Sequence, residues 1–442
     1  MQRDILKELF QWSQQQAPLP LILRGARQVG KTYLIEDFGQ KHFKHLVSLN
    51  FEYQPEFKAC FKTLNPTDIA HTISLLTKKP IIPGETLLFL DEIQECPEAI
   101  KALRYFKELM PALHIVGAGS LLEFTLNDEN FRMPVGRVLF MHLKPLSFRE
   151  YLTATDNHEL REYLTTVTIE NGIPEPIHQK LLKLMREYMV LGGMPAVIKE
   201  YINSKNLNQC QIIQSALLNT YRGDFGKYAS KVDYKYLQQL FTKIPGLIAQ
   251  HFKYSKIDPD TRARDLKSAL QKLCDAGLIQ QIFATSASGL PLNALIDEKR
   301  FKVLFLDIGL VNRTSNLDAD ILLEENLLLI NRGMLAEQLV GQELLAYSNY
   351  YEPGQLFFWH REQKSSIAEI DFVTNVGSKI IPIEVKSGNT GRLKSLHIFM
   401  QEKNIPLGVQ ISQQPLGLSR SILNLPLYLI NELSRLVQTI SY

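Results

Sequence analysis

Eight residues near the amino end constrain the fold of this chain more than any other part of it. They fit the pattern G-x-x-x-x-G-K-[ST] of a phosphate-binding loop, and they are Gly25, Ala26, Arg27, Gln28, Val29, Gly30, Lys31 and Thr32. A short apolar run at 20–24 precedes the loop, and residues 33–38 have helical spacing. Strand, glycine-rich turn and helix are the context that this loop needs, so we expect a parallel α/β domain here.

The residue types of the loop fit the chemistry of a nucleoside triphosphate. Glycine permits a tight turn whose N–H groups point at phosphate oxygens, and the start of the following helix adds positive potential. We expect Lys31 to reach the β- and γ-phosphates and Thr32 to bind Mg²⁺.

A second apolar run, at 86–90, ends in the acidic pair Asp91 and Glu92. We expect Asp91 to hold the magnesium and Glu92 to polarise the attacking water as general base. The alternative is an ordinary buried strand with two acids at its exposed end. The phosphate loop upstream favours the nucleotide site.

Two polar residues follow or precede later strands of the same domain. Ser120 follows the expected strand at 114–118 and is the candidate to contact the γ-phosphate, although a serine here can instead cap the next helix. Arg137 precedes the expected strand at 138–143 and is the candidate arginine finger, in this chain or in a neighbouring subunit of a homo-oligomer. The alternative is a surface arginine.

Several stretches spread over nearly the whole chain carry a family resemblance. They are residues 23–32, 89–94, 135–138, 143–150, 191–197, 222–224, 306–309, 369–373 and 383–386. Together they resemble a prokaryotic family of AAA-type ATPases that carry a C-terminal domain of unknown function. The resemblance implies ATP binding and hydrolysis, and it supplies no agreed substrate.

We expect an α/β multidomain protein with four parts. They are an AAA-type P-loop ATPase core at 1–150, a helical lid and hinge at 151–208, a winged-helix-like domain and connector at 209–329, and a restriction-endonuclease-like α/β module at 330–442. Gly192, Gly193 and Pro195 are the candidate hinge, and a plain turn between helices is the alternative.

Basic residues mark one amphipathic helix of the expected winged helix. Arg262, Arg264 and Lys267 lie beside an apolar face, and a strand-like run follows the helix. That order suits a winged helix whose second helix enters a DNA major groove, so double-stranded DNA is a candidate partner. The alternative is a structural or protein-binding winged helix whose charges face solvent.

The segment 367–386 has the pattern of a hairpin. If its strands pair in register, Asp371, Glu384 and Lys386 converge, and Glu337 on an upstream helix can join them. This is the D…E-x-K arrangement of restriction-endonuclease-like folds, in which carboxylates bind Mg²⁺ or Mn²⁺ and a lysine assists the attacking water. The alternative is a binding module in which these residues form ion pairs. If the hairpin forms, Pro382 in its second strand must lie at a strand start or a free edge, because proline cannot donate to a ladder.

Composition limits the class of protein. The 442 residues carry a formal net charge of +3, which neither demands nor excludes nucleic acid. No apolar run is long enough for a membrane span, and the first residues lack the apolar core of a signal peptide. The four cysteines are far apart and form no metal-ligand pair, which favours a reducing cytoplasm.

Two functions of different classes remain open. The leading hypothesis is an ATPase that couples nucleotide state to a DNA-directed C-terminal half, with or without metal-dependent nuclease activity. The alternative is a slow ATP-dependent switch whose nuclease-like module is inactive and binds protein. A small-molecule kinase is a third class, but nothing after the core indicates an acceptor site.

Overall fold

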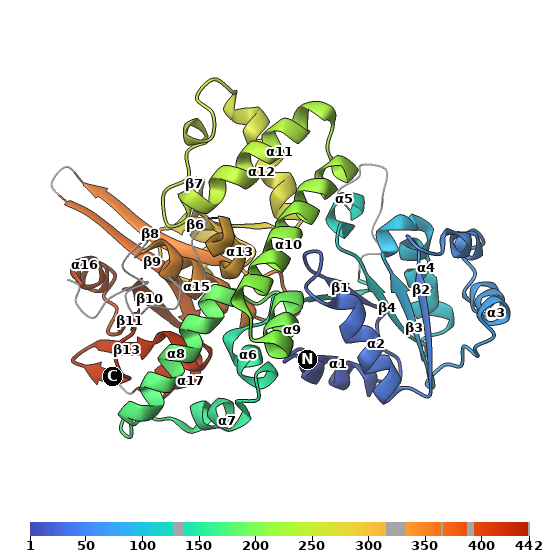
Figure 1. The fold of residues 1–442 in the computed structure, drawn as a ribbon, viewed down its shortest axis with the longest axis horizontal. Coiled ribbons are helices and arrows are strands. Elements are labelled where there is room, and N and C mark those ends of the chain that lie inside the picture. The colour runs from blue at the N-terminus through green and yellow to red at the C-terminus, as the bar shows by residue number, and fades with distance from the viewer. Residues whose placement is uncertain (127–135, 315–332, 364–365, 387–392, 441–442) are drawn as a thin grey trace.

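The computed structural model describes residues 1–126, 136–314, 333–363, 366–386 and 393–440. Its amino-terminal part is built on a sheet of five parallel strands in the order β2-β3-β4-β1-β5 (Figure 1). The strands are β1 (Leu21–Arg24), β2 (His45–Asn50), β3 (Thr86–Asp91), β4 (His114–Ala118) and β5 (Leu139–His142). The helices of this part are α1 (Leu6–Ser13), α2 (Lys31–His42), α3 (Pro66–Thr77), α4 (Pro97–Leu109) and α5 (Leu122–Leu126). The expected parallel α/β core is thus confirmed.

Strand β3 shows why this part folds as a layered domain. All six of its residues are buried. Leu87 and Phe89 belong to one hydrophobic cluster, and Leu88 and Leu90 belong to another. Because successive side chains point to opposite faces, both faces of the sheet are covered, as a continuous apolar run predicts for a central parallel strand.

Seven helices of the described chain follow the sheet. They are α6 (Phe148–Ala154), α7 (His158–Thr166), α8 (Glu175–Leu191), α9 (Pro195–Ser204), α10 (Leu207–Tyr228), α11 (Lys231–Lys243) and α12 (Ala263–Asp275). Helices α8, α9 and α10 lie between the two sheets of the molecule (Figure 1). Among the described residues, none of the helices combines the length and the apolar character that a membrane crossing requires.

The carboxy-terminal part is built on a mixed sheet of eight strands in the order β12-β13-β11-β10-β9-β8-β6-β7. The strands are β6 (Ile279–Thr285), β7 (Ile296–Phe305), β8 (Leu356–Gln363), β9 (Ser366–Val376), β10 (Lys379–Val385), β11 (Gly408–Ser412), β12 (Gly417–Ser419) and β13 (Ile422–Pro426). The associated helices are α13 (Ile308–Thr314), α15 (Met334–Ala346), α16 (Lys394–Lys403) and α17 (Leu433–Thr439).

The hairpin β6–β7 differs from the wing that the sequence predicts. Strand β6 pairs in parallel with β8, so the hairpin continues the sheet of the following module. The boundary expected at 329/330 lies outside the described residues and stays a prediction. Pro382 fits its strand because β10 pairs with β11 only from Ile383 onward, which leaves the proline outside that ladder.

The glycine pair Gly192–Gly193 contacts the segment 306–309 where the helices join the carboxy-terminal part. The Gly193 amide donates to Asp307 Oδ2 over 2.6 Å, and the Gly193 carbonyl accepts from the Leu146 amide over 2.7 Å. A Cβ on Gly193 would lie 2.1 Å from the Leu146 carbonyl oxygen, so only glycine fits here. The candidate hinge is therefore held by backbone contacts on two sides, and its movement stays a prediction.

We expect Gly193→Ala to lower the free energy of unfolding by about 3 kcal/mol, because the new methyl group would force apart two packed backbone segments. Gly226→Ala is the matched control, since a Cβ there meets no atom within 4 Å and the residue lies inside α10. The control is expected to gain roughly 0.5–1 kcal/mol. Thermal melting of both variants measures the difference, and equal melting temperatures would contradict this packing argument.

Candidate functional site

The phosphate loop lies at the carboxyl end of β1 and leads directly into α2. Gly25 has φ +148°, and a Cβ on it would lie 2.3 Å from the Leu143 carbonyl oxygen, so the first glycine of the motif is required by space as well as by backbone angle. Lys31 is buried, and its ammonium donates to the carbonyls of Gly25 and Ala26 over 2.8 and 2.9 Å. Burial lowers the pKa of Lys31 to about 8.

The acidic pair lies opposite the loop. The Thr32 hydroxyl donates to Asp91 Oδ2 over 3.0 Å, and the Asn50 amide donates to the same oxygen over 2.9 Å. Burial and the neighbouring Glu92 raise the pKa of Asp91. The Gln94 side chain donates to Glu92 Oε2 over 2.6 Å. The oxygen atoms of Thr32 and Asp91 are the ligand type that Mg²⁺ prefers.

Ser120 and Arg137 have different surroundings. Ser120 is buried and lines a small cavity together with Arg27 and Asp224, close to the loop. Arg137 is half exposed, and its Nε lies 3.4 Å from Glu108 on α4. This contact gives no support to a role of Arg137 on the nucleotide of its own chain, and the role on a neighbouring subunit stays a prediction.

A cavity of about 390 Å³ opens beside the amino end of α2. It is lined mainly by apolar groups, among them Met1, Tyr33, Leu146 and Pro195, with Gly30 at the loop side. Its size is that of ordinary small-molecule sites. The cavity therefore adjoins the phosphate loop and has room for a small organic group.

The loop also contacts helices from the middle of the chain. Arg27 Nη1 donates to Asp224 Oδ1 on α10 over 2.7 Å, and the Tyr221 hydroxyl donates to the Arg27 carbonyl over 3.0 Å. Burial alone would lower the pKa of Arg27, but Asp224, together with Glu52 and Glu92, outweighs burial and raises the pKa. A Cβ on Gly277, just after α12, would lie 3.4 Å from Ala26. The loop is thus in contact with both α10 and the end of α12.

The four residues expected at the nuclease-like site come together. Asp371 Oδ2 accepts from the Val385 amide over 2.8 Å, and Lys386 Nζ lies 2.5 Å from Glu384 Oε1. Burial and the charge of Asp371 raise the pKa of Glu384 to about 7 and that of Glu337 well above its ordinary value. Burial also raises the pKa of Asp371.

Sequence reasoning missed the lysine at the centre of this cluster. Lys302 on β7 is 1% exposed, and its Nζ lies 2.5 Å from Glu369, 3.2 Å from Glu337 and 3.9 Å from Asp371. These carboxylates outweigh the effect of burial and raise the pKa of Lys302. The sequence offered one signal of it, because Lys302 is a charged residue inside the otherwise apolar run 301–305. The contacts of Asn50, Gln94 and Asp224 were also missed, although Gln94 and Asp224 lie inside the stretches 89–94 and 222–224 that carry the family resemblance.

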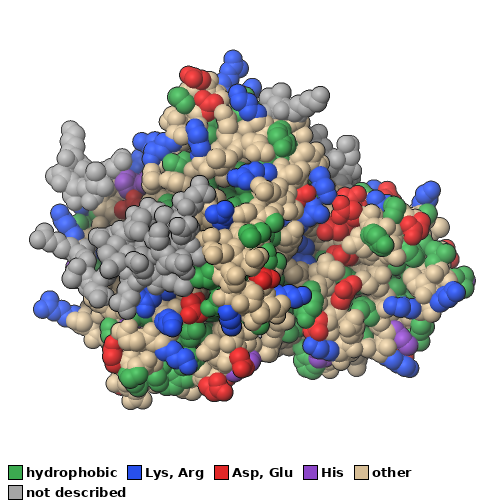
Figure 2. Space-filling view, in the orientation of Figure 1, with side chains coloured by type: hydrophobic (Ala, Val, Ile, Leu, Met, Phe, Trp, Pro, Cys, Tyr) green, Lys and Arg blue, Asp and Glu red, His purple; other side chains and the backbone are tan. Residues whose placement is uncertain are grey.

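The candidate DNA contacts lie at the start of α12. Arg262, Arg264 and Lys267 are exposed, whereas Leu266 and Leu270 on the other face are buried. Lys and Arg side chains occupy the surface in the region of α11 and α12 (Figure 2). The helix therefore presents a charged face to solvent, as its pattern predicts, and DNA contact stays a prediction.

Three stretches of the chain match family models. Residues 18–152 match an AAA domain, residues 182–321 match a domain of unknown function (DUF8612), and residues 332–428 match a second one (DUF4143). The amino-terminal part is therefore an AAA-type ATPase domain. An uncharacterised protein of Methanocaldococcus jannaschii is 23% identical over 262 residues, which cover 54% of this chain and 53% of that protein. The match thus spans about half the length of this relative.

Solved structures give weaker matches. A Walker-type ATPase of Pyrococcus abyssi aligns with a TM-score of 0.42 and 14% identity over 70% of this chain and 94% of that one. AMPPCP-bound DnaA from Aquifex aeolicus aligns with a TM-score of 0.26 and 13% identity over 61% and 84% of the two chains. Both TM-scores are below 0.5.

We expect Lys302→Met to lower the free energy of unfolding by about 3–5 kcal/mol near pH 8, because it removes the ammonium that three partly or fully buried carboxylates share. The pKa values of Glu337 and Asp371 are already raised in the folded protein. The folded variant therefore binds protons that the unfolded chain does not bind, and its stability falls as pH rises, so the loss is smaller near about pH 5.

Thermal melting between these pH values measures both effects. Lys299→Met, an exposed lysine on the same strand, is the control and is expected to change little. A Lys302→Met protein that melts like the control at every pH would show that the cluster does not need this cation.

Proposed function

We propose that this protein binds ATP with Mg²⁺ at the phosphate loop, hydrolyses it, and transmits the nucleotide state to a DNA-directed carboxy-terminal half. The observation that carries the proposal is the arrangement of Lys31, Thr32, Asp91 and Glu92 at the carboxyl edge of a parallel sheet. Together with the match of residues 18–152 to an AAA domain, this arrangement supports a site for a triphosphate.

Binding uses the loop and the adjoining cavity. The loop amides and the start of α2 hold the phosphate oxygens, and Lys31 turns its ammonium from the carbonyls of Gly25 and Ala26 to the phosphates. A bound anion restores the positive charge that burial disfavours on Lys31. The base and ribose occupy the cavity beside Gly30, where the lining is mostly apolar.

Hydrolysis depends on the acidic pair. Thr32 and Asp91 are the residues that would hold Mg²⁺, which supplies positive charge to the phosphate oxygens when bound. Glu92 takes the proton of the attacking water. The hydrogen bond from Gln94 fixes the Glu92 side chain 2.6 Å away, so Gln94 sets where the base points before the water is activated.

Transmission runs through the contacts of the loop with the middle helices. Arg27 is paired with Asp224 on α10, and Ala26 lies against Gly277 after α12. A rearrangement of the loop on binding phosphate therefore acts on the carboxyl end of α12, whose amino end carries the basic residues Arg262 and Arg264. The 13 residues of this helix span about 20 Å, so it connects the two regions as a rigid rod.

We expect Lys31→Ala to abolish binding of a fluorescent ATP analogue, since both the charge and the loop contacts are lost. Glu92→Gln is expected to bind ATP normally and to lower turnover by roughly 10²–10⁴-fold, as removal of a general base does. Phosphate release and equilibrium binding measure the two effects separately. Glu95→Gln, a half-exposed acid three residues away, is the control and keeps full turnover. Wild-type turnover in Glu92→Gln would reject Glu92 as the base.

The second candidate function is a slow ATP-dependent switch with an inactive nuclease-like module. Lys302 is the observation that favours it. Its ammonium lies within 4 Å of both Glu337 and Asp371, the carboxylates that a nuclease would use to bind a metal. In this alternative the acids are partners of a structural cation, and the module recognises its target without cutting it.

We expect Arg264→Ala combined with Lys267→Ala to weaken duplex DNA binding and to reduce the slope of log K against log salt by about 2, one phosphate contact for each residue. Titrations of labelled duplex at several salt concentrations measure this. Lys41→Ala with Lys44→Ala removes the same charge from exposed positions of the ATPase domain and is the control. Unchanged duplex binding would remove α12 from the proposal.

The same protein, incubated with plasmid, Mg²⁺ and ATP, distinguishes the two candidates. Cleavage that is lost in both Asp371→Ala and Glu384→Ala supports the nuclease. Absence of both cleavage and DNA binding supports the switch.

A further inference from the structure

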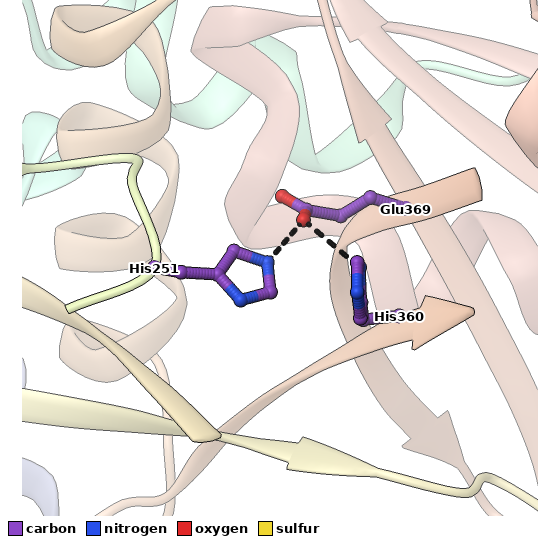
Figure 3. Close-up of side chains that lie close together, drawn as sticks. All are labelled: His251, His360 and Glu369. Carbon is purple, nitrogen blue, oxygen red and sulfur yellow. Dashed lines mark hydrogen bonds and ion pairs between the residues drawn. The ribbon is translucent and has the colours of Figure 1, made fainter. Parts of the chain in front are cut away.

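Two histidines that belong to no motif of the sequence gather with Glu369 beside the acidic cluster. His251 lies between the short turn η3 (Ile244–Leu247) and α12, His360 is on β8, and Glu369 is on β9. One ligand atom of each side chain lies within 4.8 Å of the others. Both imidazole rings face the same oxygen of the Glu369 carboxylate (Figure 3). Three separate segments of the chain therefore direct donors at one point.

The donor types and spacing fit a metal ion. Imidazole nitrogen with one carboxylate is the ligand set of three-ligand Zn²⁺ sites, whose metal–ligand distances of about 2.0–2.2 Å place two ligand atoms roughly 3.4 Å apart in a tetrahedron. His360 Nδ1 lies 3.5 Å from Glu369 Oε2, which is already this separation. His251 Nε2 lies 2.6 Å from the same oxygen, which is closer than two ligands of one tetrahedral ion lie, so binding requires this loop histidine to move away from Glu369.

The scaffold holds two of the donors in place. His360 and Glu369 are directly opposite each other in the antiparallel pair β8–β9, and the His360 side chain is 6% exposed. Glu369 Oε1 is 2.5 Å from Lys302 Nζ, which leaves Oε2 to the histidines. Such a partner on the far oxygen orients a ligating carboxylate.

The protonation of Glu369 suits a ligand. Its carboxylate contacts the Lys302 ammonium through Oε1 over 2.5 Å, and this contact favours the ionised form. The carboxylate is therefore charged near neutral pH, as a metal ligand must be. The side chains of His251 and Glu369 are about one-third exposed, so an ion and a fourth, water ligand can reach the point where the donors meet.

The surrounding charge also accommodates a divalent cation. Among the described residues, Glu337, Glu369, Asp371 and Glu384 interact with two lysines, Lys302 and Lys386. These six side chains, when fully ionised, carry an excess of two negative charges. The raised pKa values of three of these acids reduce the excess, because a protonated acid carries no charge. A bound divalent cation would also neutralise it.

We propose that His251, His360 and Glu369 form a binding site for a divalent transition-metal ion of the Zn²⁺ class, with a fourth coordination position open to water. The site is distinct from the Asp371–Glu384 pair expected of a nuclease, because it uses nitrogen donors, and it does not depend on ATP or DNA. A bound ion links the loop before α12 to the β8–β9 hairpin. It therefore ties the helical region to the carboxy-terminal sheet at a point next to Lys302.

The test is metal retention by the full chain, purified without a histidine tag. The protein is stripped with chelator, given an excess of Zn²⁺, desalted and analysed for metal, and Co²⁺ is used as a second probe because its visible spectrum reports the ligand set. The expected result is about one equivalent of Zn²⁺ per chain. His251→Ala, His360→Ala and Glu369→Gln are each expected to weaken binding by more than about 100-fold, the upper end of the loss caused by changing an outer-shell partner.

His397→Ala, which removes an exposed histidine of the same module, is the matched control and is expected to retain the metal. Glu369→Gln keeps the size of the side chain, so with a native circular dichroism spectrum it separates loss of a ligand from loss of fold. Wild-type protein that retains no metal, or three variants that retain as much as wild type, would overturn the proposal. His251 and Glu369 would then form only a hydrogen-bonded pair. None of these outcomes bears on ATP hydrolysis.

Discussion

The contact between the phosphate loop and the middle helices is the constraint on which the architecture depends. A loop of this kind needs only its strand, its helix and its acidic partner to hold phosphate. Here its third residue, Arg27, is paired with Asp224 on α10, and the Arg27 carbonyl accepts from Tyr221. Because Arg27 is only three residues from Gly30, the loop cannot change shape without changing its contacts with α10.

A second set of contacts fixes the segment before α9. Gly193 fits between Leu146 and Asp307, so the segment before α9 is fixed to both the end of the ATPase domain and the start of α13. Burial raises the pKa of Asp307 to about 6, although it accepts bonds from the Gly193 and Leu310 amides. A carboxylate buried in this way destabilises the fold unless its oxygen atoms keep their hydrogen-bond donors. The joint is therefore held by interactions that favour one arrangement.

The sequence predicted the parts of the fold whose signals are local. The phosphate loop, the acidic pair at the end of β3 and the parallel strands each depend on a few consecutive residues, and the structure has them where they were expected. Helices are likewise present in the segment 151–208, where a helical part was expected. The continuation of β6–β7 into the later sheet was missed because the pairing of β6 with β8 joins segments about 70 residues apart. No hydrophobic period shows which distant strand a hairpin joins.

The site residues also divide into those that a local motif identifies and those that it does not. Lys31 and Asp91 belong to motifs with fixed spacing, and Glu337, Asp371 and Glu384 were expected to converge once a hairpin was assumed. Lys302 could not be assigned to them, because it comes from β7 and meets partners 35 or more residues away. Gln94, in contrast, is two residues from the Glu92 it holds, and a polar side chain so close to the expected base was a signal that the motif alone did not interpret.

Lys302 shows how the charge of the acidic cluster is compensated. Carboxylates buried at close range need a counter-charge, and a protein can supply it as a proton, a cationic side chain or a metal ion. The cluster shows two of these solutions in adjoining places: raised pKa values on Glu337 and Glu384, and an ammonium between Glu337, Glu369 and Asp371. An ammonium has three N–H donors, and Lys302 contacts only the Oε1 atom of the Glu369 carboxylate. The other oxygen meets two imidazole rings, and this is the one point of the cluster where nitrogen donors, a charged carboxylate and access to solvent coincide among the described residues.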